Sequence, residues 1–124
     1  MKRLYFLIPV LMIIFASCYK RDYYPDYHND TDWMRTHDHG VVAYVDYPTG
    51  NYIVDMHNGF AVVEYYGGAT AERYDEVYAY FDSFGLQTVF NYSIGRYTQA
   101  RVVDSWLTWS DAMYLLDQLS YGGY

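Results

Sequence analysis

The sequence predicts a mainly β (α+β) fold: a small six-stranded antiparallel barrel-like sheet with one C-terminal helix. Three observations favour this fold. Short runs rich in β-branched and aromatic residues recur from residue 40 onward. Turn-forming residues separate the runs, and Asn58-Gly59 is the strongest hairpin signal among them. The last segment changes to the 3.6-residue spacing of an amphipathic helix.

Six strands are expected where these runs lie. In the fourth run, Tyr78 and Tyr80 lie on one face, opposite Val77, Ala79 and Phe81; if the second face is core, the tyrosines form an exposed stripe, and the sequence leaves this open. The expected strands cover residues 41–47, 52–57, 60–66, 76–81, 86–91 and 100–106.

The C-terminal segment predicts a helix that starts at a capping box from Thr108 to Asp111 and ends at Gly122-Gly123. So short a helix is not stable alone. We therefore expect it to cap an open end or a face of the sheet and to plug the barrel. Its apolar stripe consists of Ala112, Leu115, Leu116 and Leu119.

The composition argues against several classes of protein, partner and site. The chain has 124 residues, about one domain, and its 52% hydrophobic and 22% aromatic content argues against a disordered tail, a fibre or a coiled coil. Fifteen acidic and eight basic residues give −7, and the charge is about −9 without Lys2 and Arg3. This acidity disfavours nucleic acid as a partner. A single Cys excludes an internal disulfide framework and a Cys-based zinc site, and no cofactor is expected.

The first 17 residues have the pattern of a secretory signal peptide. Lys2 and Arg3 precede 13 mostly apolar residues, 4–16, which small residues follow. Thirteen helical residues span roughly 20 Å, short of the ~30 Å hydrocarbon core of a bilayer. The segment therefore predicts export, with residues 1–17 removed.

The residues Phe15-Ala16-Ser17-Cys18 resemble the lipobox of bacterial lipoproteins. Ala16, Ser17 and Cys18 match the motif, and Phe15 in place of the usual Leu is similar to the looser lipoboxes of Bacteroidota-type bacteria. The resemblance implies that Cys18 is lipidated, becomes the new N-terminus and anchors the protein to a bilayer. Tyr19, where Asp would signal retention in the inner membrane, implies the outer membrane. Whether the protein faces the periplasm or the cell surface stays open.

Residues 18–39 are predicted to be the lipidated Cys and a flexible tether, followed by a compact domain over residues 40–124. The segment 19–39 holds three basic and five acidic residues and no Val, Ile or Leu. As a coil it would reach roughly 25 Å. The alternative is that Trp33 and its aromatic neighbours dock onto the domain or the membrane interface.

A second resemblance covers residues 59–92. The segments NGFAVVEYY, DEVYAYFDSFG and TVFN are similar to those of small OB-like or SH3-like barrels. This resemblance implies a barrel fold and transfers no function.

Two clusters could carry chemistry. In an extended chain His37 and His39 point the same way and could share a metal with Asp46, Asp55 or His57, although solvated linker histidines are the simpler interpretation. Glu64 and Asp104 lie in apolar strand patterns and could form a carboxylate pair for glycoside hydrolysis, although such residues more often face solvent. The sequence has no GxSxG elbow.

The 18 tyrosines are the compositional anomaly. Tyrosine offers a rigid ring with a hydrogen-bonding tip, which suits contact with sugars and proteins, but it also has high β propensity. The candidate ligand-contact residues are Tyr65, Tyr66, Tyr78 and Tyr80.

Three functions follow as hypotheses. The leading one is a non-enzymatic envelope lipoprotein whose β domain binds a protein or glycan partner. The alternatives are a metal-dependent or carboxylate-based hydrolase and a structural envelope spacer.

Overall fold

The computed structural model describes residues 30–122. The chain divides into two units, Met1–Asp32 and Trp33–Tyr124, and the features below belong to the second. The expected signal peptide, Cys18 and most of the expected tether lie outside the described residues. Within the described part, no helix has the length and hydropathy needed to cross a membrane.

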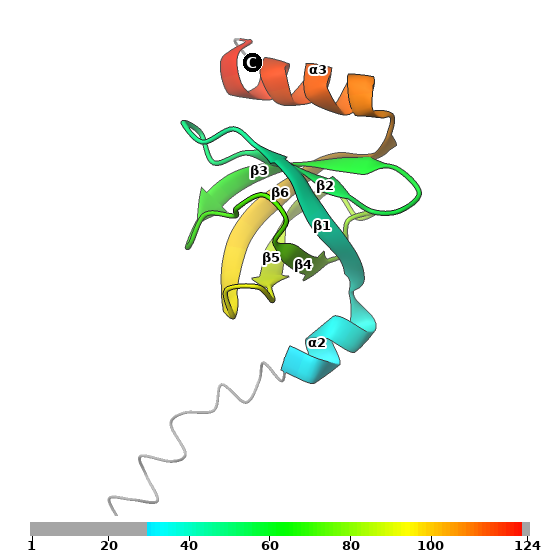
Figure 1. Cartoon of the computed structure of the whole chain (residues 1–124), viewed down its shortest axis with the longest axis vertical. Coiled ribbons are helices and arrows are strands. Elements are labelled where there is room, and N and C mark those ends of the chain that lie inside the picture. The colour runs from blue at the N-terminus through cyan, green and yellow to red at the C-terminus, as the bar shows by residue number, and fades with distance from the viewer. Residues whose placement is uncertain (1–29, 123–124) are drawn as a thin grey trace, which may run out of the picture. The chain divides into compact units, whose positions relative to one another are not determined.

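The fold is mainly β with one C-terminal helix, as the sequence predicts. All six expected strands form, and the sixth starts earlier than expected (Figure 1). The elements are α2 (Asp30–Thr36), β1 (Asp38–Val45), β2 (Tyr52–Asp55), β3 (Phe60–Gly67), β4 (Glu76–Ala79), β5 (Gly85–Asn91), β6 (Arg96–Leu107) and α3 (Trp109–Tyr121).

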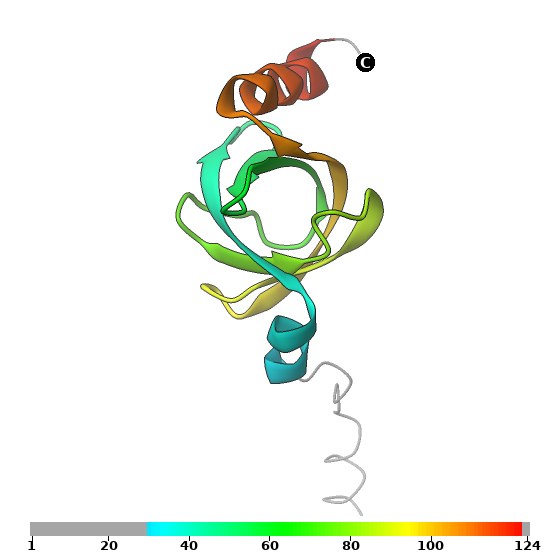
Figure 2. The ribbon, with the colours of Figure 1, turned by 90° about the vertical axis from the view of Figure 1, so that its right-hand side faces the viewer.

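The strands form a closed antiparallel barrel in the order β1-β2-β3-β6-β5-β4 (Figure 2). Closure depends on β1, which pairs with β4 over residues 38–41 and with β2 over residues 41–45. A register shift between Val42 and Tyr44 marks a bulge on the β2 side of β1. Since a bulge increases the bend and twist of a strand, it helps β1 to pair with β4 at one end and with β2 at the other.

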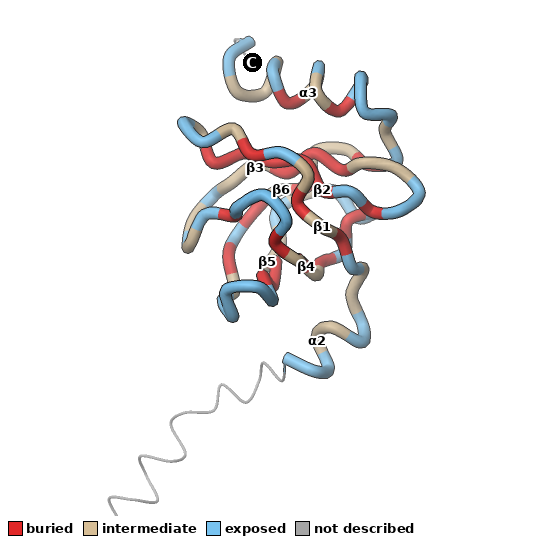
Figure 3. Tube along the Cα trace, in the orientation of Figure 1, coloured by how far each residue is buried: buried red, intermediate tan, exposed pale blue. Residues whose placement is uncertain are grey.

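The barrel interior is filled by small and branched side chains, which fit a ring of six strands. Phe81 and Tyr52 are its largest members, and Figure 3 shows the buried positions along the strands. The core face of β4 is the one that carries Val77 and Ala79, because both are buried and Phe81 follows them inward. The other members are Val42, Val45, Val54, Met56, Ala61, Val63, Ala71, Val89, Ala100 and Val102.

Gly40 is required where β1 crosses the interior. A Cβ at this position would lie 2.2 Å from Val54 Cγ1, on the neighbouring strand β2. That distance is far inside van der Waals contact, and Val54 is fully buried with no room to move. Glycine at position 40 therefore sets how closely β1 approaches β2.

The C-terminal helix α3 does not plug the barrel, which corrects the expectation. It lies outside the ring of strands, against the outer faces of β2, β3 and β6 (Figure 2). Ala112 and Leu116 are buried against outward-facing Ile53 and Val62. The interior is already full of side chains, so the apolar stripe of α3 has its partner on the outer wall. Thr108 caps the helix as expected, accepting a hydrogen bond from the Asp111 N–H.

Polar contacts fasten the last turn of α3 to the β1–β2 turn. The buried Asn51 amide donates from Nδ2 to Ser120 Oγ (3.1 Å), and its Oδ1 accepts from the Tyr65 N–H (2.9 Å). The Tyr121 hydroxyl donates to Asp46 Oδ1 (2.7 Å), and the Thr49 hydroxyl donates to Asp46 Oδ2. Partial burial acts to raise the pKa of Asp46, but the hydrogen bonds from Thr49 and Tyr121 outweigh it and lower the pKa.

The substitution Gly40→Ala is expected to destabilise the barrel by about 3 kcal/mol, because the added methyl overpacks the core against Val54. Denaturant unfolding of both proteins measures the difference. Gly67→Ala is the matched control: a Cβ there meets nothing within 4 Å. It should change stability by less than about 1 kcal/mol. Equal losses in the two variants would contradict the close approach of β1 to β2.

The lowered pKa of Asp46 makes stability depend on pH. Its carboxylate stabilises the folded state above the unfolded-state pKa, near 3.9, and this contribution is lost as pH falls through the lower folded-state pKa. In Asp46→Asn, stability is therefore expected to fall less steeply below about pH 4 than in the unsubstituted protein. Thermal unfolding across this range measures it. Parallel pH curves would contradict the hydrogen-bonded carboxylate.

Candidate functional site

The residues immediately before β1 contact the barrel, whereas residues 18–29 of the predicted tether lie outside the described residues. Residues 30–36 are helical, and β1 begins at Asp38, so the boundary at residue 40 lies inside β1. Trp33 donates from Nε1 to the Tyr78 carbonyl on β4 (3.1 Å) and contacts Tyr97 edge to face. The alternative that Trp33 docks onto the domain is thus the one that the structure supports. Such a helix is held by its aromatic contacts, since seven residues are too few for a stable helix alone.

His37 and His39 lie against Tyr80 and Tyr78, respectively, on the outer face of the barrel at β1 and β4. His37 stacks between Trp33 and Tyr80, with ring centroids 3.9 Å from each. His39 pairs in register with Tyr78, and their centroids are 4.9 Å apart. Tyr78 and Tyr80 face outward, which the sequence left open, and the histidines and Trp33 partly cover them.

Neither histidine is arranged around a common metal position with the other expected ligands. His37 Nδ1 contacts the Trp33 carbonyl (2.9 Å), and His39 Nε2 lies 3.1 Å from Glu76 Oε1. Among residues 30–122, no group of three or more His, Cys, Asp or Glu side chains is placed to hold a metal ion.

The other candidate residues lie elsewhere on the barrel. Tyr65 and Tyr66 belong to β3, which is not a neighbour of β4, so the four candidate tyrosines do not form one surface. Tyr65 donates to the Gly68 carbonyl, whereas Tyr66 is exposed. Glu64 is paired with Arg101, whose Nε is 2.8 Å from Glu64 Oε1. Asp104 Oδ1 accepts from the Ser105 N–H.

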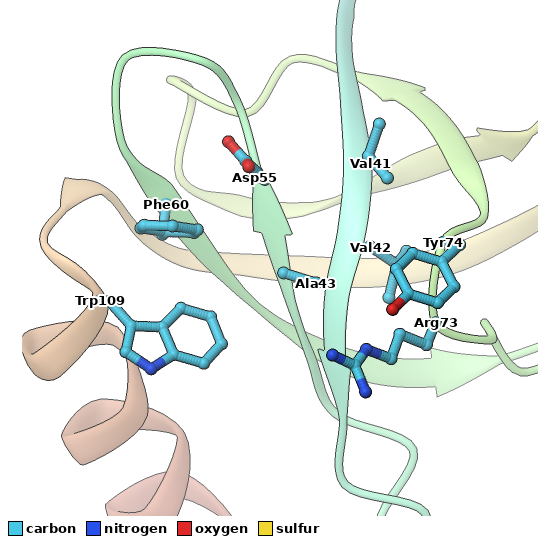
Figure 4. A pocket seen from close by; sticks show the side chains of 8 residues that line it. All are labelled: Val41, Val42, Ala43, Asp55, Phe60, Arg73, Tyr74 and Trp109. Carbon is cyan, nitrogen blue, oxygen red and sulfur yellow. The ribbon is translucent and has the colours of Figure 1, made fainter.

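A groove lies on the outer face of β1. The helix α3 covers β2, β3 and β6, and the Trp33 stack covers β4, so the flank of β1 between them stays open. The groove has a volume of about 350 Å³. It is lined by Val41, Val42, Ala43, Asp55, Phe60, Arg73, Tyr74 and Trp109 (Figure 4).

The two long walls of the groove are aromatic. Trp109 and Phe60 stand on one side of β1, with Tyr74 and Arg73 on the other (Figure 4). Phe60 packs edge to face against Trp109 at 5.1 Å and so fixes the indole. Arg73 Cζ lies 5.0 Å from the centroid of the Tyr74 ring, a cation–π contact. The small side chain of Ala43 leaves space between the walls.

The loop that carries Tyr74 is held firmly although its backbone is strained. Tyr74 has φ +77°, a conformation that costs a non-glycine residue energy. Its N–H donates to the Val42 carbonyl (2.8 Å), and the Val42 N–H donates to the Asp75 carbonyl (2.9 Å). The buried Asp75 carboxylate accepts from Asn91 Nδ2 and from the Glu72 N–H, both at 2.9 Å. Strained residues of this kind concentrate at functional sites.

A second hollow adjoins the groove and shares Val41 and Asp55 with it. Its volume is about 250 Å³, and it is also lined by His39, Met56 and His57. His57 is another strained residue, with φ +83°, and its N–H donates to Asp55 Oδ1 (3.0 Å). The two hollows therefore lie next to each other, with Val41 and Asp55 at their common border.

Of the groove residues, the sequence patterns indicate Asp55 but not Arg73, Tyr74 or Trp109. Trp109 lies three residues before Ala112, so an extension of the apolar stripe of α3 to this residue would have placed it on the face toward the barrel. Arg73 and Tyr74 follow no periodic pattern, and no motif in the neighbouring sequence predicts a positive φ at a tyrosine.

No protein-family model, curated protein or solved structure matches this chain.

The strain at Tyr74 predicts different stabilities for two variants that both lack the tyrosine ring. Tyr74→Gly is expected to be about 1 kcal/mol more stable than Tyr74→Ala, because glycine adopts positive φ without a Cβ penalty. Denaturant unfolding of the pair measures the difference. If Tyr74→Ala equals or exceeds Tyr74→Gly in stability, the backbone is not held in the left-handed region.

Proposed function

We propose that this chain is a membrane-anchored envelope lipoprotein whose small β-barrel binds a protein or glycan partner without catalysing a reaction. The observation that carries the proposal is the open groove on β1, where exposed aromatic side chains line a hollow next to Arg73 and Asp55. Aromatic walls with a few placed polar groups are typical of binding sites. The lipobox-like residues ending at Cys18 support the anchored form.

The attachment of the N-terminal segment is compatible with such a site. The chain enters the barrel unit at Trp33, which is fastened to β4. In the closed strand order β4 is three strands away from β3, the centre of the face that α3 covers. Within the barrel unit, Trp33 and the centre of the face that α3 covers therefore lie on opposite sides of the ring of strands.

The state of the polar residues favours binding over catalysis. Glu64 is neutralised by Arg101, and His37 lies between two aromatic rings. Within the groove, Asp55 is held by the His57 N–H and has no second carboxylate among the lining residues. A paired acid and base for glycoside hydrolysis needs two such groups across one hollow.

Lipidation at Cys18 is tested in a bacterial host with an alkyne-labelled fatty acid. The unsubstituted chain is expected to take up the label and to lose residues 1–17. Cys18→Ala should take up no label and remain at precursor mass, because the acyl chains need the thiol. Membrane fractionation followed by mass spectrometry reads both results. Equal labelling of the two chains, or cleavage at another residue, would overturn the anchored form.

Partner binding is tested with a photo-crosslinking amino acid placed at Tyr74 in cells. Tyr114, on α3 and similarly exposed (68% against 70%), is the matched control position. An adduct is expected at position 74 and not at 114, and its sensitivity to proteases and glycosidases identifies its class. Protease treatment of intact cells then shows which side of the membrane the barrel faces. The absence of any adduct specific to position 74 would count against the proposed function.

A further inference from the structure

We propose that the groove binds a neutral saccharide, with one pyranose ring held between Tyr74 and Trp109. This inference rests on the proposed function, because it takes the groove as the binding site and names its ligand class. It follows from the shape of the two walls, the polar groups beside them and the charge of the chain.

The walls suit the faces of a sugar ring. A pyranose presents C–H groups on its faces, and aromatic rings with their negative π faces attract such groups. Trp109 is 42% exposed and Tyr74 is 70% exposed, so each has free ring surface. Their supports are also fixed: Phe60 packs on Trp109, and backbone hydrogen bonds with Val42 hold the Tyr74 loop to β1. Little conformational entropy is therefore lost when a ring enters.

The polar groups suit the rim of a sugar ring. Asp55 is an acceptor only, and Arg73 is a donor only. A sugar hydroxyl both donates and accepts. Figure 4 shows the two side chains at opposite ends of the groove, so each would pair with a different hydroxyl of the ligand. The His57 N–H holds Asp55 Oδ1 at 3.0 Å and orients the carboxylate. An apolar ligand would leave both charged groups without new partners and would lose their solvation.

The size of the site favours a short oligosaccharide over a protein surface. A volume of about 350 Å³ is near the lower end of the range for small-molecule sites. A stable protein interface usually buries more than about 1,000 Å² in total. The adjoining hollow of about 250 Å³, with His39 and His57 in its lining, continues past Asp55 and has room for a second sugar unit.

The charge of the chain favours a neutral sugar over an acidic one. The chain carries −7, and Asp55 itself lines both hollows. A uronic acid or a phosphorylated sugar would meet that carboxylate and an acidic protein surface, and Arg73 alone would oppose the repulsion.

The test uses the full lipidated protein in a zwitterionic detergent without sugar headgroups. The probes are maltose, cellobiose, laminaribiose and N,N′-diacetylchitobiose, followed by amide chemical shifts and by calorimetry. At least one probe is expected to shift the amides of residues 41–43 and 73–74 and to bind at millimolar concentration or below. Trp109→Ala and Tyr74→Gly should each weaken binding at least about tenfold. Tyr114→Ala removes a similarly exposed ring outside the groove and should leave affinity unchanged.

Two results would overturn the saccharide: no probe binds at millimolar concentration, or binding persists unchanged in Trp109→Ala and Tyr74→Gly. Tighter binding of cellobiouronic acid than of cellobiose would overturn the neutral class. Unfolding midpoints of each variant identify any loss of fold, and Tyr74→Gly keeps the loop conformation while it removes the ring. A protein adduct at position 74 in cells, with no sugar bound in vitro, would reject the saccharide and retain the proposed function. If neither an adduct at position 74 nor sugar binding is observed, both the saccharide and the proposed function are rejected.

Discussion

The double pairing of β1 is the constraint on which the rest of the structure depends. One strand must hydrogen-bond to β4 with its first half and to β2 with its second half. Gly40 permits the close approach to β2 because any Cβ would collide with Val54, and the bulge after Val42 turns the strand. Without this bend the sheet would stay open and expose two strand edges, which pair readily with other chains.

Closure of the barrel also explains why the candidate groove lies on its outer wall. The interior is filled by apolar side chains. Outward-facing apolar residues such as Ile53 and Val62 must then be covered from outside, and α3 supplies that cover. On β4 the cover comes from Trp33 and the two histidines. The part of β1 that neither cover reaches is the floor of the groove.

The groove combines rigid support with local strain. Asp75 and Asn91 are buried polar residues that hydrogen-bond to each other, and they fix a loop whose Tyr74 is in an unfavourable backbone conformation. Buried polar groups with satisfied partners rigidify and specify a structure. The hydrogen bonds of this loop offset the strain, and the result is a tyrosine ring aimed over β1.

The sequence by itself determined the class of the fold, the six strands, the capped helix and the alternation of faces along β4. Period-2 and period-3.6 patterns encode which residues share a face of an element, so the placement of Val77 and Ala79 opposite Tyr78 and Tyr80 could be predicted, but not which of the two faces is buried. The tertiary structure decided which faces meet. Local patterns do not specify that α3 lies on the outer wall, that His37 and His39 stack on the β4 tyrosines, or that Tyr74 opposes Trp109. Those contacts join residues that are distant in the chain, and only the closed strand order with its register brings them together.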